Sequence, residues 1–395
     1  MIEKTKGHFS FGRNVIFAIF IILSATFFIR SSNNMMITST PLLAKYFLGF
    51  SQKEVGLITA LSYFITFITT SLINTRLSSK ERRIAFISSM AVYAFTFIGF
   101  WKASSITLWF LVAISGAALG LIMPNIMTSA GLFNERKVRE MVLSLYTVSL
   151  SLSLVVGPAV ESYVLRFISL RESFMVFSSF ALIALIISPF LAFPDEGRQR
   201  IKVKVLSNVG FRMSLINIIS YNVPFTILVA FGGIYEHERF GASLSLISIL
   251  FSLFFLSSFI SRLTMSFLPP RRLARNMVAA MILTITGILF MVFSNNILYF
   301  AISLLILGIP HGLTYPLSIL SLARSYKPEE RNVANSYFFS FMTGIGIVVP
   351  TIGGFLMDTY GYNKVFLGIL FMILTLLMML AFNVKIAKNM TYESV

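Results

Sequence analysis

The chain has 395 residues, of which 56% are hydrophobic and only 12% charged, and its formal net charge is +17. Soluble domains average about 25% charged residues, so this composition excludes a water-soluble protein and indicates an integral membrane protein. The absence of cysteine excludes disulfides, thiolate metal sites and cysteine nucleophiles. The positive charge does not predict a nucleic-acid partner, because the basic residues lie in short breaks between apolar segments.

Twelve apolar segments are long enough to cross a bilayer, which takes about 20 residues each. They are expected at residues 13–38, 54–76, 82–101, 105–133, 139–168, 172–194, 209–235, 241–266, 272–293, 296–324, 331–357 and 362–386. The predicted fold class is therefore all-α integral membrane, with twelve transmembrane helices. The lipid bilayer is the expected surrounding, and a cell membrane the expected location.

The lysines and arginines predict the orientation of these spans. With the N-terminus in the cytoplasm, 24 of the 32 basic residues fall on the cytoplasmic side, and Arg262 is counted in that group. Seven fall outside, and Arg30 lies within the first span. Since basic residues favour cytoplasmic loops, both termini are predicted to be cytoplasmic.

A gapless shift of 192 residues matches the two halves of the chain to each other. GLIMP at Gly120–Pro124 then meets GLTYP at Gly312–Pro316. The same shift aligns glycine, serine, arginine, proline and phenylalanine pairs: Gly49 and Gly241, Ser51 and Ser243, Arg83 and Arg275, Arg139 and Arg331, Pro158 and Pro350, and Phe174 and Phe366. Two pseudo-symmetric six-helix bundles are therefore expected.

The longest polar break, DEGRQRIKVKVLSN at residues 195–208, divides these halves. The predicted domains are an N-terminal bundle at 1–194, a basic cytoplasmic linker at 195–208 and a C-terminal bundle at 209–395. Span five carries GPAVES at Gly157–Ser162, and span eleven carries VPTIGG at Val349–Gly354. With the parallel repeat, these motifs make the chain resemble transporters of the major facilitator superfamily, whose antiporter motif reads GPxxGG.

The loop after span two departs from that family. The resemblance implies GxxxDRxGRR there, but the glycines and the aspartate are missing. The residues at the matching positions are Ser71, Thr75, Arg76, Ser78, Ser79 and Lys80. The family's usual cytoplasmic gating contact is therefore not expected in this chain.

Once the charges assigned to loops are set aside, three ionisable residues remain within the predicted spans: Arg30, Glu161 and His311. Each costs about 2.5–3.5 kcal/mol to place in hydrocarbon, so each is a functional candidate. Each also has an ordinary alternative. Arg30 is alternatively a snorkelling residue, Glu161 a residue in the external headgroups, and His311 a packing residue hydrogen-bonded between helices.

The resemblance implies that spans one, four, seven and ten line a central cavity, with span five beside span one. Arg30, Asn33 and Asn34 are spaced i, i+3 and i+4 and therefore share one helix face. The expected cavity residues are Arg30, Asn33, Asn34, Asn125, Asn222, His311 and Tyr315. Glu161 and His311 are expected to serve proton coupling or gating, and Glu161 is a candidate ion-pair partner of Arg30. A helix-bending role is expected for Gly157, Pro158, Pro350, Gly353 and Gly354.

The leading functional hypothesis is a secondary active transporter that works by alternating access. The GPAVES motif favours proton-coupled efflux of an amphipathic compound, as the resemblance implies for such antiporters. The first alternative is transport of an organic anion or metabolite by Arg30, a reading that requires Arg30 to be unpaired. The second is a non-transporting membrane sensor on the same fold.

An enzyme is not expected, because the sequence shows no nucleophile elbow, metal-ligand cluster or paired intramembrane carboxylates. No cofactor, metal or catalytic residue is predicted, and a monomer is expected. The predicted partners are a small-molecule substrate and a proton or other coupling ion.

Overall fold

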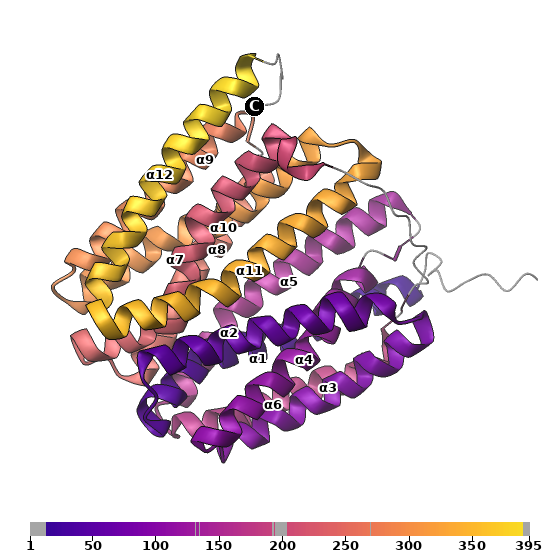
Figure 1. The fold of residues 1–395 in the computed structure, drawn as a ribbon. Helices are drawn as coiled ribbons and strands as arrows, with labels where there is room; N and C mark the ends of the chain where they lie inside the picture. Colours follow the sequence, from indigo (N-terminus) through magenta and orange to yellow (C-terminus); the bar gives the residue numbers. More distant parts are fainter. Residues whose placement is uncertain are drawn as a thin grey trace, which may run out of the picture. The chain divides into compact units, whose positions relative to one another are not determined.

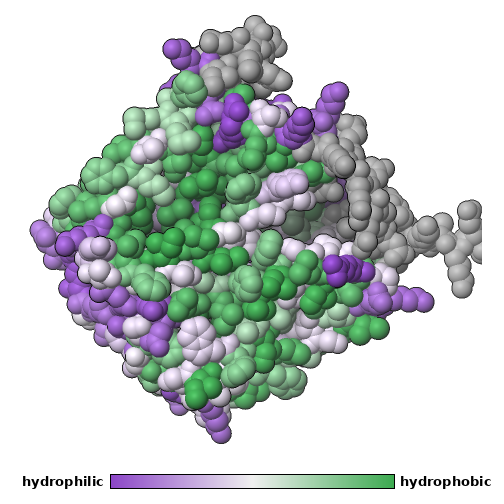
Figure 2. Space-filling view, viewed as in Figure 1, coloured by the Kyte–Doolittle hydropathy of each residue, from purple (hydrophilic) through white to green (hydrophobic). Residues whose placement is uncertain are grey.

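The computed structural model describes residues 13–130, 132–133, 135–191, 193, 204–268 and 270–389. The described part contains twelve helices that are long and apolar enough to cross a membrane (Figure 1). Figure 2 shows apolar side chains over much of the visible helix surface, with hydrophilic ones gathered toward helix ends. The prediction of an all-α membrane protein with twelve spans is therefore confirmed.

The helices follow the expected order. The first six are α1 (Arg13–Leu42), α2 (Gln52–Ile68), α3 (Ser79–Trp101), α4 (Ser105–Ala130), α5 (Arg136–Val164) and α6 (Leu170–Ile187). The last six are α7 (Val209–Phe240), α8 (Leu244–Phe267), α9 (Leu273–Phe293), α10 (Ile297–Ser325), α11 (Pro328–Tyr360) and α12 (Tyr362–Asn389). Short π or 3₁₀ segments continue α1 to Phe47, α2 to Arg76 and α6 to Phe190.

Polar residues directly before several helices explain where those helices begin. Ser78 and Ser169 form capping boxes with Glu81 and Glu172 at the starts of α3 and α6. Three further helices begin after a side chain that accepts a backbone N–H bond: Asn208 before α7, Ser243 before α8 and Asn296 before α10. Ser78, in the loop that departs from the family pattern, therefore serves as a helix cap.

Contacts divide the chain into two compact units. The first unit is Met1–Gly49 with Leu61–Arg198, and the second is Phe50–Ala60 with Gln199–Val395. The beginning of α2 belongs to the second unit, where the Asp358 carboxylate of α11 accepts bonds from the backbone nitrogens of Gln52 (3.0 Å) and Lys53 (2.9 Å). In the predicted linker, residues 195–203 lie outside the described residues.

The 192-residue repeat relates the helices of the two units. Adding 192 to the first residues of α2, α4, α5 and α6 gives 244, 297, 328 and 362, which are the first residues of α8, α10, α11 and α12. The repeat-matched Gly49 and Gly241 also share a left-handed backbone, with φ of 72° and 65°. Glycine adopts this conformation without the penalty that a Cβ would cause.

The matched GLxxP motifs begin with glycines that allow two helices to pack closely. A Cβ on Gly120 of α4 would lie 2.8 Å from the carbonyl oxygen of Thr66 in α2. The repeat-matched Gly312 of α10 lies still more tightly against the carbonyl of Ser258 in α8, and so does Gly308 against that of Phe254. Small residues at membrane helix contacts permit this approach, so the repeat preserves the packing of α2 on α4 and of α8 on α10.

We predict that Gly308→Ala destabilises the protein by about 1–3 kcal/mol, because the added methyl group meets the Phe254 carbonyl and overpacks the α8–α10 contact. Gly344→Ala is the matched control, since a Cβ at this position in α11 meets nothing within 4 Å. Thermal unfolding of the detergent-solubilised protein measures both. Equal unfolding temperatures for the two variants would contradict this account of the glycines.

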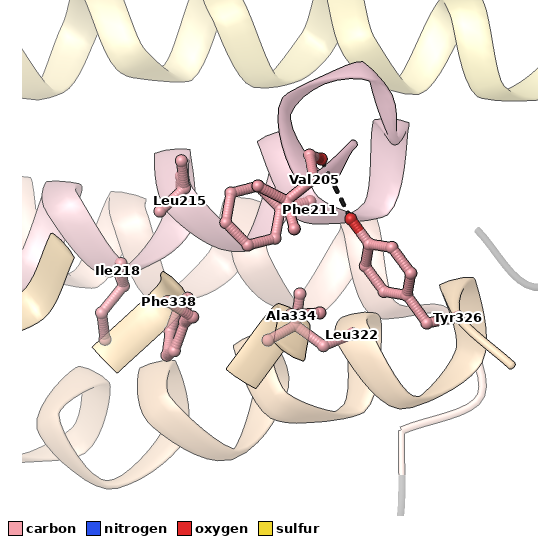
Figure 3. Packing of buried hydrophobic residues seen from close by; sticks show 8 residues of the cluster. All are labelled: Val205, Phe211, Leu215, Ile218, Leu322, Tyr326, Ala334 and Phe338. Atoms are coloured by element: carbon pink, nitrogen blue, oxygen red, sulfur yellow. Dashed lines mark hydrogen bonds between the residues drawn. The ribbon is translucent and has the colours of Figure 1, made fainter. Parts of the chain in front are cut away.

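A cluster of buried residues closes one end of the second unit, where the chain enters α7 (Figure 3). Its members are Val205, Phe211, Leu215, Ile218, Leu322, Tyr326, Ala334 and Phe338. The Tyr326 hydroxyl donates to the Val205 carbonyl at 2.9 Å, which ties the segment before α7 to the end of α10 (Figure 3). Burial, with the nearby Glu330 carboxylate, raises the pKa of Tyr326 to about 12.

This raised pKa predicts a loss of stability at high pH. The neutral Tyr326 hydroxyl contributes stability that is fully present below pH 10.0, its ordinary pKa, and is lost as the pH rises through about 12. Tyr326→Phe should therefore lose less stability than the wild type over that interval. Tyr299→Phe, at an exposed tyrosine of α10, is the control and should follow the wild type. Parallel pH profiles for wild type and Tyr326→Phe would contradict the assignment.

Candidate functional site

The polar segment of α1 contains a group of buried atoms without partners. Arg30 Nε, Ser31 Oγ, Asn33 Oδ1 and Asn34 Nδ2 are buried and have no hydrogen-bond partner within the described part of the chain. Three other hydroxyls of α1 bond to carbonyls of their own helix, those of Thr26, Ser32 and Thr38. Because buried polar groups normally have partners, these four atoms make the segment a candidate site for a polar ligand.

Two other helices border this segment. Gly157 of α5 lies against it, since a Cβ there would be 3.0 Å from the Ser31 carbonyl oxygen. From α3, the fully buried Tyr93 lies within electrostatic range of Arg30. The first glycine of GPAVES therefore serves close packing of α5 on the polar segment, and α5 remains helical through Pro158. The bending role proposed for this motif stays a prediction.

Glu161 is fully buried within the protein. Its Oε1 accepts a hydrogen bond from the Ser39 hydroxyl of α1. Ser39 is nine residues beyond Arg30, which is about 13 Å along a helix that rises 1.5 Å per residue. The carboxylate is therefore held beside Ser39, well away from the level of Arg30 on α1, and this geometry does not support the expected ion pair.

Asn125 and Asn222 both connect helices within their own units. Asn125 Nδ2 of α4 donates to Asn74 Oδ1 at 2.8 Å and to the Leu121 carbonyl at 2.5 Å. Asn222 Nδ2 of α7 lies 3.4 Å from the Met342 carbonyl of α11. These amide groups already have protein partners, in contrast to the unpartnered amide atoms of α1.

His311 lies among aromatic rings in the second unit. The ring centroids of Phe225, Phe254, Phe255 and Tyr221 lie 4.5, 5.2, 5.6 and 5.7 Å from that of the imidazole. Its Nδ1 is 2.7 Å from the Ser258 hydroxyl of α8. These are the contacts that the packing alternative predicts, because the imidazole links α8 and α10 by a hydrogen bond.

Arg262 was expected with the loop arginines, and the structure corrects this. It lies inside α8, within electrostatic range of both His311 and Tyr315 on α10. The Tyr315 ring also packs against Phe339 of α11, with centroids 6.0 Å apart. The nearby Arg271, Arg272 and Arg275 made Arg262 look like a loop residue, although the predicted span 241–266 already included it.

Glu236 was missed because span seven was expected to end at residue 235. In the structure α7 continues to Phe240 and ends at the left-handed Gly241. Glu236 is fully buried, and neither of its carboxylate oxygens has a hydrogen-bond partner in the described part of the chain. Gly241, a typical helix-ending residue, is the sequence signal that would have placed Glu236 inside the helix.

The two glycines of VPTIGG pack against different neighbours in the second unit. A Cβ on Gly354 would lie 2.5 Å from the Gln52 carbonyl oxygen at the start of α2, and Gly353 lies against the Ile227 side chain of α7. Helix α11 continues through Pro350. The described residues contain no group of three or more histidine, cysteine or acidic side chains placed to hold a metal ion.

We predict that Ser39→Ala destabilises the protein by about 1–3 kcal/mol, because the buried Glu161 carboxylate loses a hydrogen-bond donor. Ser179→Ala is the matched control, since Ser179 is exposed on α6 and bonds the Val176 carbonyl of its own helix. Thermal unfolding in detergent compares the two. Equal unfolding temperatures would show that the bond between α1 and α5 contributes nothing.

Solved structures with the same fold include several transporters. A bacterial homolog of the human lysosomal transporter Spinster, inward-facing and unoccupied, has a TM-score of 0.68 at 15% identity, covering 89% of this chain and 84% of that one. The nucleoside transporter NupG has a TM-score of 0.68 and the human organic anion transporter MFSD10 one of 0.67, each at 15% identity over 93% of this chain and 99% of theirs. These likenesses concern the fold.

Sequence comparison is more specific about the family. A protein TsgA homolog from Buchnera aphidicola subsp. Schizaphis graminum (strain Sg) is 29% identical over 106 residues, which is 26% of this chain and 27% of that protein. The sequence profile of the Major Facilitator Superfamily matches residues 22–237 and 213–391. The chain therefore belongs to the Major Facilitator Superfamily and is a multi-pass membrane transporter.

Proposed function

We propose that the chain is a secondary active transporter of small organic anions, which moves them by alternating access. The observation that carries this proposal is the Arg30 guanidinium, whose Nε is buried in α1 without a partner among the described residues. An arginine in a membrane span requires a negatively charged or strongly polar partner. A carboxylate substrate would supply it through charge-assisted hydrogen bonds.

The neighbouring side chains support the same chemistry. Asn34 Nδ2 is a hydrogen-bond donor and Asn33 Oδ1 an acceptor, and both lack partners in the described part of the chain. Together with Arg30 they would bind a carboxylate and one further donor group of the same molecule. Glu161 is held by Ser39, so it leaves Arg30 available for an anion.

MFSD10, one of the proteins with the same fold, is described as an organic anion transporter. At 15% identity that likeness concerns the fold, so the proposal for this chain rests on the α1 residues. The coupling ion in this proposal is the proton, and the distribution of basic residues supports a cytoplasmic location for both termini.

A second candidate substrate is an amphipathic compound without a negative charge. The observation that favours it is a groove of about 500 Å³ along α8 and α10 in the second unit. The groove is mostly apolar, with Leu256, Ile260, Leu305 and Ile309 among its lining residues, and Ser257, Ser261 and Thr264 add hydroxyls. Such a lining suits a largely apolar ligand with few polar groups.

Uptake into proteoliposomes that contain the purified protein tests the two candidates. The probes are a panel of labelled monocarboxylates and dicarboxylates, together with neutral and cationic amphipathic compounds. We predict carboxylate transport that is lost in Arg30→Gln and partly retained in Arg30→Lys, because lysine keeps the charge but loses the bidentate geometry.

Arg166→Gln is the matched control, since Arg166 is an exposed arginine of the same unit. It should transport like the wild type. Carboxylate transport that is unchanged in Arg30→Gln would overturn the anion proposal. Transport of neutral or cationic compounds alone would favour the second candidate, and no transport of any probe would favour a sensor.

A further inference from the structure

The Glu236 carboxyl group lies one turn before the end of α7, in the most enclosed helix of the second unit. Its side chain is 0% exposed, and neither Oε1 nor Oε2 has a hydrogen-bond partner among the described residues. Helix α7 has buried residues around its whole circumference and contacts α8, α9, α10, α11 and α12. An acidic side chain in such a place requires an explanation other than exposure to water.

An ionised carboxylate is expensive in this position. Burying a charge without a partner is strongly unfavourable, and the penalty is far smaller for a neutral carboxylic acid. The oxygens of Glu236 accept no bond from any described donor. The group is therefore expected to carry a proton in this conformation.

The charged and titratable groups at this end of the second unit have other contacts or are exposed. They are Tyr235, His237, Glu238 and Arg239 on α7, Tyr299 on α10, Asp358 and Tyr360 on α11, Tyr362 and Lys364 on α12, and Lys53 and Glu54 on α2.

Arg239 is three residues from Glu236 and would be its natural helical partner. Instead its guanidinium donates to the Tyr235 hydroxyl, to Asn363 Oδ1 and to the carbonyls of Val292 and Ser294, at 2.6 to 3.3 Å.

The two acids nearby on other helices are also engaged. Asp358 accepts from the backbone nitrogens of Gln52 and Lys53, and Glu54 accepts from Ser51. Lys53 lies over the Phe355 ring at 4.3 Å, while Lys364 and Glu238 are exposed. The charged side chains at this end of the unit therefore either have partners other than Glu236 or are exposed.

The internal repeat shows that the fold does not require an acid at this position. Subtracting 192 from 236 gives residue 44, and Ala44 is also fully buried at the corresponding end of the first unit. A methyl group therefore suffices for packing in the repeat-matched place. Glutamate at the second position introduces a titratable group that packing alone does not explain.

We propose that Glu236 is a proton-binding site of the transport cycle, a role that rests on the proposed transporter function. In the conformation described here the carboxyl O–H bond is intact. When the last turn of α7 becomes accessible to water, that bond breaks, water accepts the proton, and the carboxylate remains. Rebinding of a proton then allows the end of α7 to be buried again. Glu161 and His311, the sequence-based candidates for the coupling site, have protein hydrogen-bond partners.

Infrared spectroscopy of the full-length protein in lipid tests this protonation directly. At neutral pH the wild type should show the carbonyl stretch of a protonated carboxylic acid, shifted in D₂O. The band should be lost in Glu236→Gln and retained in Glu238→Gln, the matched control at the exposed acid two residues away. A band unchanged by Glu236→Gln would overturn the proposal. Should Glu236→Gln not fold, Glu236→Ala replaces it, because alanine occupies the matched position 44.

Transport measurements separate this proposal from the proposed function. In proteoliposomes, Glu236→Gln should lose carboxylate uptake driven by a pH gradient and keep exchange at equal pH. Loss of the infrared band in Glu236→Gln without transport of any carboxylate by the wild type would contradict the anion function and leave the proton site standing. Carboxylate transport that depends on Arg30, with pH-driven uptake unaffected by Glu236→Gln, would overturn the proton site and leave the anion function standing.

Discussion

Polar groups inside a bilayer have no water to bond, so each one needs a partner within the protein or in a ligand. Most polar side chains of this transporter follow that constraint. Asn217 Nδ2 of α7, for example, donates to Ser318 Oγ and to the Thr314 carbonyl of α10, both at 2.9 Å. Arg30, Asn33, Asn34 and Glu236 are among the residues with buried polar atoms that lack a partner in the described part of the chain, and the functional proposals rest on these four.

In the proposed mechanism, these residues divide the chemistry of transport between the two units. The α1 segment in the first unit offers a cation with amide groups, which suits an organic anion. The α7 carboxyl group in the second unit offers a place for a proton. The repeat preserves helix packing in both units, as at Gly120 and Gly312. It does not preserve the polar residues, since Arg30 is matched by Asn222 and Glu236 by Ala44. The repeated elements therefore build the fold, and the unmatched polar residues distinguish the two units.

Much of the fold could be predicted from the sequence because hydropathy and repeat spacing act over many residues at once. All twelve spans were expected, and the GLIMP and GLTYP motifs revealed the repeat, although the close helix packing at their glycines became visible only in the structure. The ends of helices were harder to predict, because a single residue such as Gly241 determines where a helix ends. Because span seven was predicted to end at residue 235, Glu236 fell outside the predicted helix. Arg262 was assigned to a loop because several arginines follow it, although it lies inside α8.

The site was less predictable than the fold, because a side chain's partner depends on tertiary contacts. Arg30, Asn33 and Asn34 could be placed on one face by helical spacing alone. Nothing in the sequence, however, showed that Ser39 would bind Glu161, or that Ser258 and four aromatic rings would surround His311. Those contacts give two of the three candidate intramembrane charges partners within the protein.

The most direct test of the anion site uses the fact that the chain contains no cysteine. Asn34→Cys would then carry a single thiol beside Arg30, and the rate of its alkylation by a water-soluble maleimide can be measured in proteoliposomes. The account predicts that the thiol reacts and that a transported carboxylate slows the reaction. A thiol that never reacts, or that reacts at the same rate with and without the transported carboxylate, would contradict a substrate site on α1.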